Sequence, residues 1–228
     1  MSLFAIADTH LSFGSNKPMD DFEGWLNYTD RLKENWNKII DDKDYVVIAG
    51  DISWAMNFDE LKADFDYINQ LNGKKIILKG NHDYWWNTMS KMNKFIEENN
   101  FNTISILHNN AFDFDDFSVC GSRGWFFDSD EEQNEKVLNR EVMRIKASIE
   151  SALNCEKIVF LHYPPVYENQ CCEEIVSLLK EKSIKKCYYG HIHGVAAKYA
   201  FDDNYDGIDF KLISADRLNF MPLLIKKF

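Results

Sequence analysis

The sequence of 228 residues has few of the residues that define unusual protein classes, with 10 glycines, 4 prolines and 5 cysteines. This low glycine and proline content excludes a collagenous or low-complexity chain and argues against intrinsic disorder. The odd number of cysteines includes no C-x-x-C spacing, so neither a disulfide framework nor a thiolate zinc knuckle is indicated. The adjacent pair Cys171-Cys172 is interpreted as ordinary helix or loop residues, the alternative being a redox or soft-metal role.

Long hydrophobic runs are also absent. Apolar runs such as 45–49 are far shorter than the ~20 residues that a membrane-spanning helix needs. The N-terminus has no basic region, and Asp8 comes too early for a signal peptide. We therefore expect a cytoplasmic protein that has no membrane partner.

Positively charged residues are fewer than negatively charged ones. The chain has 26 Lys and Arg and 37 Asp and Glu, which give a formal charge of −11. Such a surface repels phosphate backbones, so general nucleic-acid binding is not expected. A phosphate ester bound at a metal remains compatible, since a divalent cation reverses the local field. Hydrophobic residues make up 45% of the chain, as in soluble globular proteins. We expect a single domain over residues 1–228, as a monomer or small homo-oligomer.

Short apolar runs typical of strands alternate with amphipathic helical stretches along most of the chain. The expected strands are Leu3–Ala7, Tyr45–Ala49, Lys75–Leu78, Thr103–Leu107, Phe117–Gly121, Lys157–Leu161, Lys186–Tyr189, Ala196–Phe201, Ile208–Ser214 and Leu223–Lys227. The expected helices are 23–42, 59–71, 87–99, 134–153 and 172–182. Residues 112–117 are expected to form a hairpin, and only strands are expected after residue 195. This order predicts an α/β protein of two packed sheets with helices outside.

Side chains of metal-ligand type follow five of these strands. The segments are Asp8-Thr9-His10, Gly50-Asp51, Gly80-Asn81-His82-Asp83, His162 and Gly190-His191-Ile192-His193. Open α/β sheets commonly gather their sites at the carboxyl ends of strands. In extended backbone, each of the two i,i+2 pairs would point to one side. The mixture of imidazole, carboxylate and amide groups suits Zn, Mn or Fe.

A single histidine after an apolar strand is more often a structural residue than a ligand. His108, which lies outside the five segments, is interpreted in that way. Five such segments, each at the end of a strand, favour a metal site over a structural role.

The ordered string D-x-H, G-D, G-N-H-D, H and G-H-x-H resembles the signature of the calcineurin-like metallophosphoesterases, and it spans residues 8–193. The resemblance implies a two-sheet α/β/β/α sandwich, the metallo-dependent phosphatase fold. That fold agrees with the one expected from the strand and helix pattern.

The resemblance also implies two divalent metal ions, with Mn favoured over Fe or Zn. Asp8, His10 and His193 would hold the first ion. Asn81, His162 and His191 would hold the second, and Asp51 would bridge both. The implied activity is hydrolysis of a phosphomonoester or phosphodiester by a metal-bridging hydroxide, as a phosphatase or phosphodiesterase.

Two further motif residues receive catalytic roles from the resemblance. His82 would act near the leaving oxygen, and Asp83 could orient the imidazole of His82. The sequence departs from the purple acid phosphatases, because Trp54 stands where they have a metal-binding tyrosine.

Several loop residues have two interpretations. The tryptophans of the loops form an aromatic wall for the substrate or pack the loops; they are Trp54, Trp85, Trp86 and Trp125. Arg123 binds a phosphate or forms an ordinary salt bridge. The acidic run 128–132 is interpreted as a solvated helix entrance.

The substrate is expected to be a small-molecule or nucleotide phosphoester. The alternative function is a non-catalytic metal-binding scaffold with the same fold. A metal-dependent amide or lactone hydrolase is not favoured, because the H-x-H-x-D-H string of that chemistry is absent.

Overall fold

The computed structural model describes residues 1–125 and 135–228. Its first sheet has five strands in the order β13-β1-β2-β3-β4. These strands are β1 (Ser2–Ile6), β2 (Tyr45–Ala49), β3 (Lys74–Leu78), β4 (Ile104–Ile106) and β13 (Leu223–Lys227). Strands β1 to β4 run parallel, and β13 pairs with β1 in the antiparallel direction.

The second sheet has six strands in the order β11-β12-β10-β7-β6-β5. These strands are β5 (Phe112–Asp113), β6 (Phe117–Ser122), β7 (Glu156–Leu161), β10 (Lys186–Tyr189), β11 (Asn204–Tyr205) and β12 (Ile208–Leu212). A separate two-stranded ribbon consists of β8 (Val166–Tyr167) and β9 (Gln170–Cys171). The expected hairpin at 112–117 is confirmed, since β5 and β6 pair antiparallel.

Five α-helices and one 3₁₀ helix connect the strands within the described residues. They are α1 (Tyr28–Ile39), α2 (Phe58–Gln70), α3 (Met89–Glu98), α4 (Glu135–Ser151), α5 (Glu173–Glu181) and η1 (Gly194–Tyr199). None of these helices is long and apolar enough to cross a membrane. The acidic run 128–132, expected at a helix entrance, lies outside the described residues.

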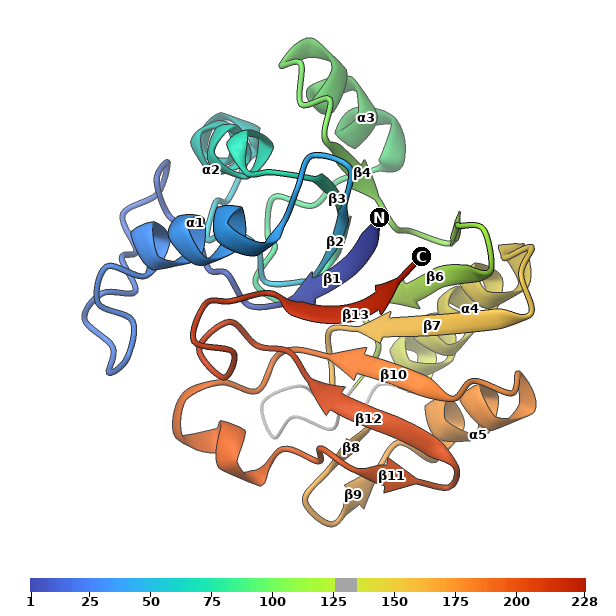
Figure 1. Ribbon diagram of the computed structural model, residues 1–228. Coiled ribbons are helices and arrows are strands. Elements are labelled where there is room, and N and C mark those ends of the chain that lie inside the picture. The colour runs from blue at the N-terminus through green and yellow to red at the C-terminus, as the bar shows by residue number, and fades with distance from the viewer. Residues whose placement is uncertain (126–134) are drawn as a thin grey trace.

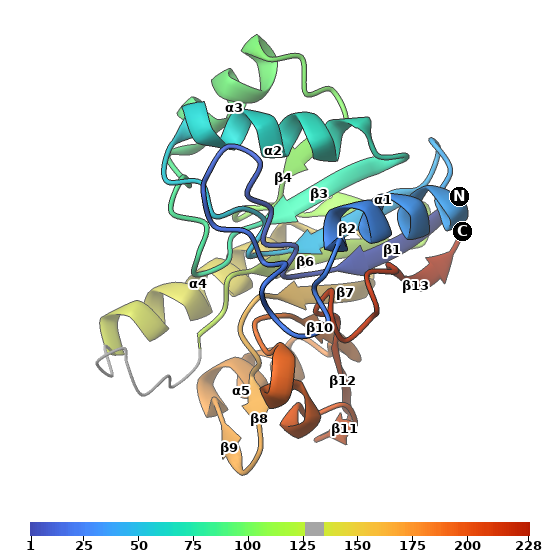
Figure 2. The same cartoon turned by 90° about the vertical axis from the view of Figure 1, so that its left-hand side faces the viewer.

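The alternation of side chains along β2 shows how the first sheet is buried on both faces. Val46 and Ile48 pack into a cluster with residues of α1, α2 and α3. Val47 and Ala49, which point the other way, pack in a second cluster against the second sheet. Helices α1 to α3 therefore cover the outer face of the first sheet (Figures 1 and 2).

The second sheet repeats this arrangement. Ile158 and Phe160 of β7 face the first sheet, whereas Val159 and Leu161 pack with residues of α4 and α5. The layers are thus helix, sheet, sheet and helix, as Figure 2 shows. The predicted α/β/β/α sandwich is confirmed.

The two sheets meet at the carboxyl end of β1. The backbone N–H of Ala7 donates to the carbonyl of Ile213 at 2.8 Å, and Ala215 N–H donates to the Ala7 carbonyl at 2.9 Å. Because β1, β2 and β3 are parallel to one another, and β7 and β10 likewise, the loops that leave these strands gather in sets. This join brings the loops of the two sheets together.

Two expected elements differ in the structure. Residues 196–201 were expected as a strand, but Gly194–Tyr199 is a 3₁₀ helix. None of its six residues is buried, so no sheet face holds the segment extended, and its two alanines and lysine favour a helix. The first helix begins at Tyr28, and not at residue 23, because Gly24 and Asn27 adopt positive φ angles of 85° and 53°.

Candidate metal centre

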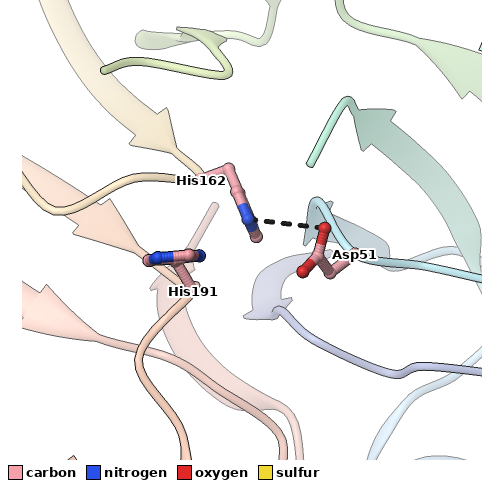
Figure 3. A group of neighbouring side chains, drawn as sticks. All are labelled: Asp51, His162 and His191. Carbon is pink, nitrogen blue, oxygen red and sulfur yellow. Dashed lines mark ion pairs between the residues drawn. The ribbon is translucent and has the colours of Figure 1, made fainter. Parts of the chain in front are cut away.

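All seven residues expected to hold metal lie on loops that leave neighbouring strands. Asp8 and His10 follow β1, Asp51 follows β2, Asn81 follows β3, His162 follows β7, and His191 and His193 follow β10. Two groups have ligand atoms within 4.8 Å of one another: Asp8, His10 and Asp51, and Asp51, His162 and His191. Figure 3 shows the second group. Asp51 belongs to both.

Lone pairs converge in the second group. His162 Nδ1 lies 3.1 Å from the carbonyl oxygen of Ala49, which can only accept, so Nδ1 carries the proton and Nε2 presents a lone pair. That Nε2 lies 2.6 Å from Asn81 Oδ1 and 3.4 Å from Asp51 Oδ1. His191 Nδ1 lies 3.0 Å from the same Asn81 oxygen. A cation among His162 Nε2, Asn81 Oδ1 and Asp51 Oδ1 would relieve the repulsion between their lone pairs, so these atoms fit a metal ion.

The first group contains buried polar atoms that lack partners. Within residues 1–125 and 135–228, both ring nitrogens of His10 and Asp51 Oδ2 have no hydrogen-bond partner. His10 Nε2 lies 3.8 Å from Asp51 Oδ2. Because an unsatisfied buried polar group costs about 1–3 kcal/mol, such atoms mark a position suited to a bound cation. A metal ion fits here as well.

The charges of the centre are unfavourable without a cation. Burial raises the pKa of Asp8 to about 8, despite hydrogen bonds that lower it. Burial, together with the charges of Asp83 and Asp8, also raises the pKa of Asp51 well above its usual value. Burial lowers the pKa of His10 and of His162 well below 6.5, which leaves both imidazoles neutral. Neutral imidazole and carboxylate are the forms that bind metals, and a divalent cation would stabilise the ionised carboxylates.

The backbone at the centre adopts conformations that are rare for side-chain-bearing residues. Asp8, His10, Asp51 and His191 have φ angles of 56°, 43°, 49° and 71°. The expectation that Asp8/His10 and His191/His193 converge through extended backbone is therefore wrong, because Asp8, His10 and His191 are left-handed and only His193 of the four is extended. Backbone of this kind costs about 1–3 kcal/mol per residue and clusters at functional sites.

Two glycines allow the loops to approach one another. A Cβ on Gly80 would lie 2.1 Å from Asp51 Oδ1. Gly50 has a φ of 89°, and a Cβ there would lie 2.6 Å from His162 Nδ1. Any larger residue at either position would displace the candidate ligands.

His193 and Asn81 stand outside the two groups of three, which contain only acidic and imidazole side chains. Asn81 nevertheless touches His162 and His191 through its oxygen, as described above. The ring of His193 lies 5.2 Å from that of His10 between centroids, on the side of the first group. Both placements are compatible with the expected ligand sets.

His82 lies at the open side of the centre. Its side chain is 31% exposed, and its Nε2 lies 4.0 Å from Asp51 Oδ2. Its Nδ1 lies 3.0 Å from the hydroxyl of Tyr84. Burial is the largest cause that lowers the pKa of His82, followed by the charges of His193 and Lys17. Tyr84 was not among the residues expected at the site, and its only signal in the sequence is an aromatic residue two positions after His82.

Asp83 does not orient His82, contrary to the expectation. Its carboxylate is fully buried and accepts backbone N–H groups from Gly80 at 2.7 Å, Ile52 at 2.8 Å and Ser53 at 3.3 Å. These bonds tie the loop after β2 to the loop after β3. Asp83 therefore holds the loops that carry Asp51 and Asn81.

Replacement of Asp83 with alanine is expected to lower the free energy of unfolding by about 3–5 kcal/mol, because three buried N–H groups lose their acceptor. Denaturant unfolding of the purified variant measures this loss. Asp83→Asn is the matched control, since its remaining oxygen still accepts and the loss is expected to be smaller. Unchanged stability with abolished activity would instead assign Asp83 to the chemistry.

The expected substrate residues divide into two sets. Trp85 is 2% exposed and packs edge-on against Phe65 at 5.3 Å, so the helix side of the first sheet holds it and it offers no face to a substrate. Trp125 is 3% exposed and is likewise buried. Neither Trp85 nor Trp125 contributes to the expected aromatic wall, because both side chains pack inside the protein instead of facing a substrate.

Trp54 and Arg123 lie closer to the centre. The Trp54 ring stacks on His10 at 4.8 Å and lies 4.6 Å from His82. Its indole N–H points to the sulfur of Met19 at 3.4 Å. The side chain of Arg123 is 19% exposed and lies 4.0 Å from Glu141, so a weak ion pair and access to solvent coexist.

Fold and site together define a two-sheet sandwich protein with a group of aspartates and histidines suited to metal. A family model described as "Calcineurin-like phosphoesterase" matches residues 1–195. The chain belongs to this family, as the motif string indicated. The family is metal-dependent, and the Asp and His groups described above could bind metal.

The individual proteins similar to this chain either match only part of it or share low sequence identity with it. The Methanocaldococcus jannaschii protein MJ1445 is 33% identical over 86 residues, which are 36% of this chain and 46% of that protein. The Mycobacterium tuberculosis phosphopantetheinyl hydrolase PptH aligns over 100% of this chain and 96% of its own, with a TM-score of 0.57 and 14% identity. The Aquifex aeolicus protein AQ665 aligns over 98% and 95%, with a TM-score of 0.52 and 15% identity. The two solved structures share the fold.

Proposed function

We propose that the protein hydrolyses phosphoesters with two divalent metal ions, Mn being the favoured metal. The observation that supports this most directly is the position of Asp51 in both ligand groups. One carboxylate shared by two sets of ligands suits a pair of ions ~3.5–4 Å apart. Asp8, His10 and His193 would hold one ion, and Asn81, His162 and His191 the other.

Two divalent cations in this centre would polarise phosphoryl oxygens and lower the pKa of water. The protein itself would supply the remaining functions. His82, partly exposed and with its Nε2 4.0 Å from Asp51 Oδ2, would donate a proton from its imidazolium form to the departing oxygen and become neutral. The hydroxyl of Tyr84 would hold the imidazole through Nδ1, and Asp83 would fix the loops of Asp51 and Asn81.

A non-catalytic scaffold is the alternative. Scaffolds of this kind typically lose ligands, whereas every expected ligand is present in this chain and lies on the loops at the centre. The orphaned atoms of His10 and Asp51 also indicate a site built to bind. The observations therefore favour catalysis.

The test is a panel of p-nitrophenyl phosphate and its bis ester with added Mn²⁺. Metal-free protein is expected to be inactive, and Mn²⁺ is expected to restore nitrophenol release from at least one of the two esters. The preferred ester separates a phosphatase from a phosphodiesterase. Two bound metal ions without turnover of either ester would favour the scaffold, and full activity after complete metal removal would contradict the proposal.

A further inference from the structure

A pocket of about 320 Å³ lies beside the metal centre, and it is lined by positively charged residues. Lys79, at the end of β3, Arg123, after β6, and Arg144, on α4, all contribute to its wall. Trp86 and His108 also line the pocket. Burial and the charge of Arg144 lower the pKa of His108, which is therefore neutral and adds no charge at pH 7.

The cations of this pocket outnumber the carboxylate that supports them. Glu141, fully buried, accepts from Arg144 Nη1 at 2.5 Å and from the Ser122 hydroxyl at 2.9 Å. Arg123 Nη2 lies 4.0 Å from the same carboxylate. One carboxylate therefore serves two guanidinium groups, and Lys79 adds a third positive charge. This excess is unusual in a chain with a formal charge of −11.

Two of the cationic side chains have unused hydrogen-bond donors. Among the described residues, Lys79 has no hydrogen-bond or ion-pair partner, although its side chain is partly buried. The Nε of Arg123 is buried and has no acceptor within that same part of the chain. An anion in the pocket would offset the excess of positive charge and accept hydrogen bonds from Lys79.

The pocket adjoins the residues of the metal centre through the backbone. The carbonyl of Arg123 accepts from the N–H of His162 at 3.0 Å. Lys79 precedes the candidate ligand Asn81 by two residues, so their Cα atoms lie within about 7 Å. Segments that line the pocket therefore also carry or hold candidate metal ligands, so the pocket and the metal centre are neighbours in the fold.

We propose that this pocket binds a second phosphate-type anion of the substrate, through Lys79, Arg123 and Arg144. The substrate class is then a phosphoester that carries another phosphate group near the scissile one. This inference rests on the proposed function, because it locates the scissile phosphate at the metal centre.

The test compares two non-hydrolysable probes on the metal-loaded full chain. Propane-1,3-diylbisphosphonate carries two phosphonates, and propylphosphonate carries one. Calorimetry is expected to show that the bisphosphonate binds at least about tenfold more tightly. Arg144→Gln and Lys79→Gln are each expected to reduce this ratio to about threefold or less, and raised ionic strength is expected to reduce it as well.

Lys146→Gln is the matched control, because it removes one charge from the same helix at a residue outside the pocket. Lys146 is 41% exposed and pairs with Glu150 at 4.0 Å. The ratio of bisphosphonate to monophosphonate affinity in Lys146→Gln is expected to equal that of the unmodified protein. Chelation of free metal by the bisphosphonate would affect all variants alike. Lys79→Gln is expected to fold even if Arg144→Gln does not, because Lys79 has no described partner whose loss would leave a buried charge unpaired.

Equal affinity for the two probes in the unmodified protein would overturn the proposal. An affinity ratio that stays unchanged in both Arg144→Gln and Lys79→Gln would also overturn the proposal. Preferential bisphosphonate binding with no hydrolysis of any ester would support the anion pocket and overturn the proposed function. Hydrolysis without that preference would retain the proposed function and overturn the pocket.

Discussion

Replacement of Asp51 with asparagine is expected to remove bound metal and to lower phosphoester hydrolysis by more than about 10³-fold. The loss should exceed the ~10–100-fold effects of residues that only support ligands. The reason is geometric, because Asp51 alone belongs to both ligand groups. Its Oδ1 lies 3.4 Å from His162 Nε2, and its Oδ2 lies 3.8 Å from His10 Nε2.

Metal analysis of the purified variant measures this directly, without an activity assay. Asp51→Asn is expected to retain less metal than a variant of any other single ligand. Asp44→Asn is a suitable control, because Asp44 is also a buried carboxylate but precedes β2, at the opposite end of the strand from Asp51. A full complement of two ions in Asp51→Asn would contradict the shared role.

Replacement of His82 with alanine is expected to reduce hydrolysis of alkyl phosphoesters by ~10²–10⁴-fold, the usual contribution of general acid catalysis. Nitrophenyl esters are expected to lose much less, because nitrophenolate departs without a proton. The variant is expected to keep its fold and its metal, since His82 is partly exposed and lies outside both ligand groups.

Tyr84→Phe tests the positioning of His82. This change removes the hydroxyl 3.0 Å from Nδ1 but leaves the imidazole in place. We expect a loss of about tenfold or less, again larger on alkyl than on nitrophenyl esters. Steady-state kinetics on both ester types measures the two variants. Equal losses on both ester types in His82→Ala would indicate stabilisation of transition-state charge, and loss of metal would make His82 a ligand.

The ligand positions could be predicted because the signals are local. Each candidate ligand lies within four residues of the end of a strand. Strand alternation and strand ends can both be recognised from neighbouring residues alone. Gly50 and Gly80 precede ligands in the sequence, and the structure gives the reason, since a Cβ at either position would enter the space of Asp51 or His162. The order of strands and helices likewise predicted the sandwich.

Contacts between distant segments could not be predicted in this way. Asp83 looked like a support for its neighbour His82, yet its carboxylate reaches Ile52 and Ser53 of another loop. Trp85 stands beside the motif in sequence and packs against Phe65 in the core. In both residues the direction of the side chain depends on loop conformation, which adjacent residues do not specify.

By itself the sequence determined the family, the two-sheet architecture and the candidate metal ligands, because these depend on local periodicity and motif order. Only the tertiary structure decided the side-chain direction of four of these candidates, through left-handed backbone at Asp8, His10, Asp51 and His191. It alone placed Lys79, Arg123 and Arg144 around one pocket from a strand end, a loop and a helix. Such groupings arise when separate elements pack, and long-range packing leaves no periodic signal in the chain.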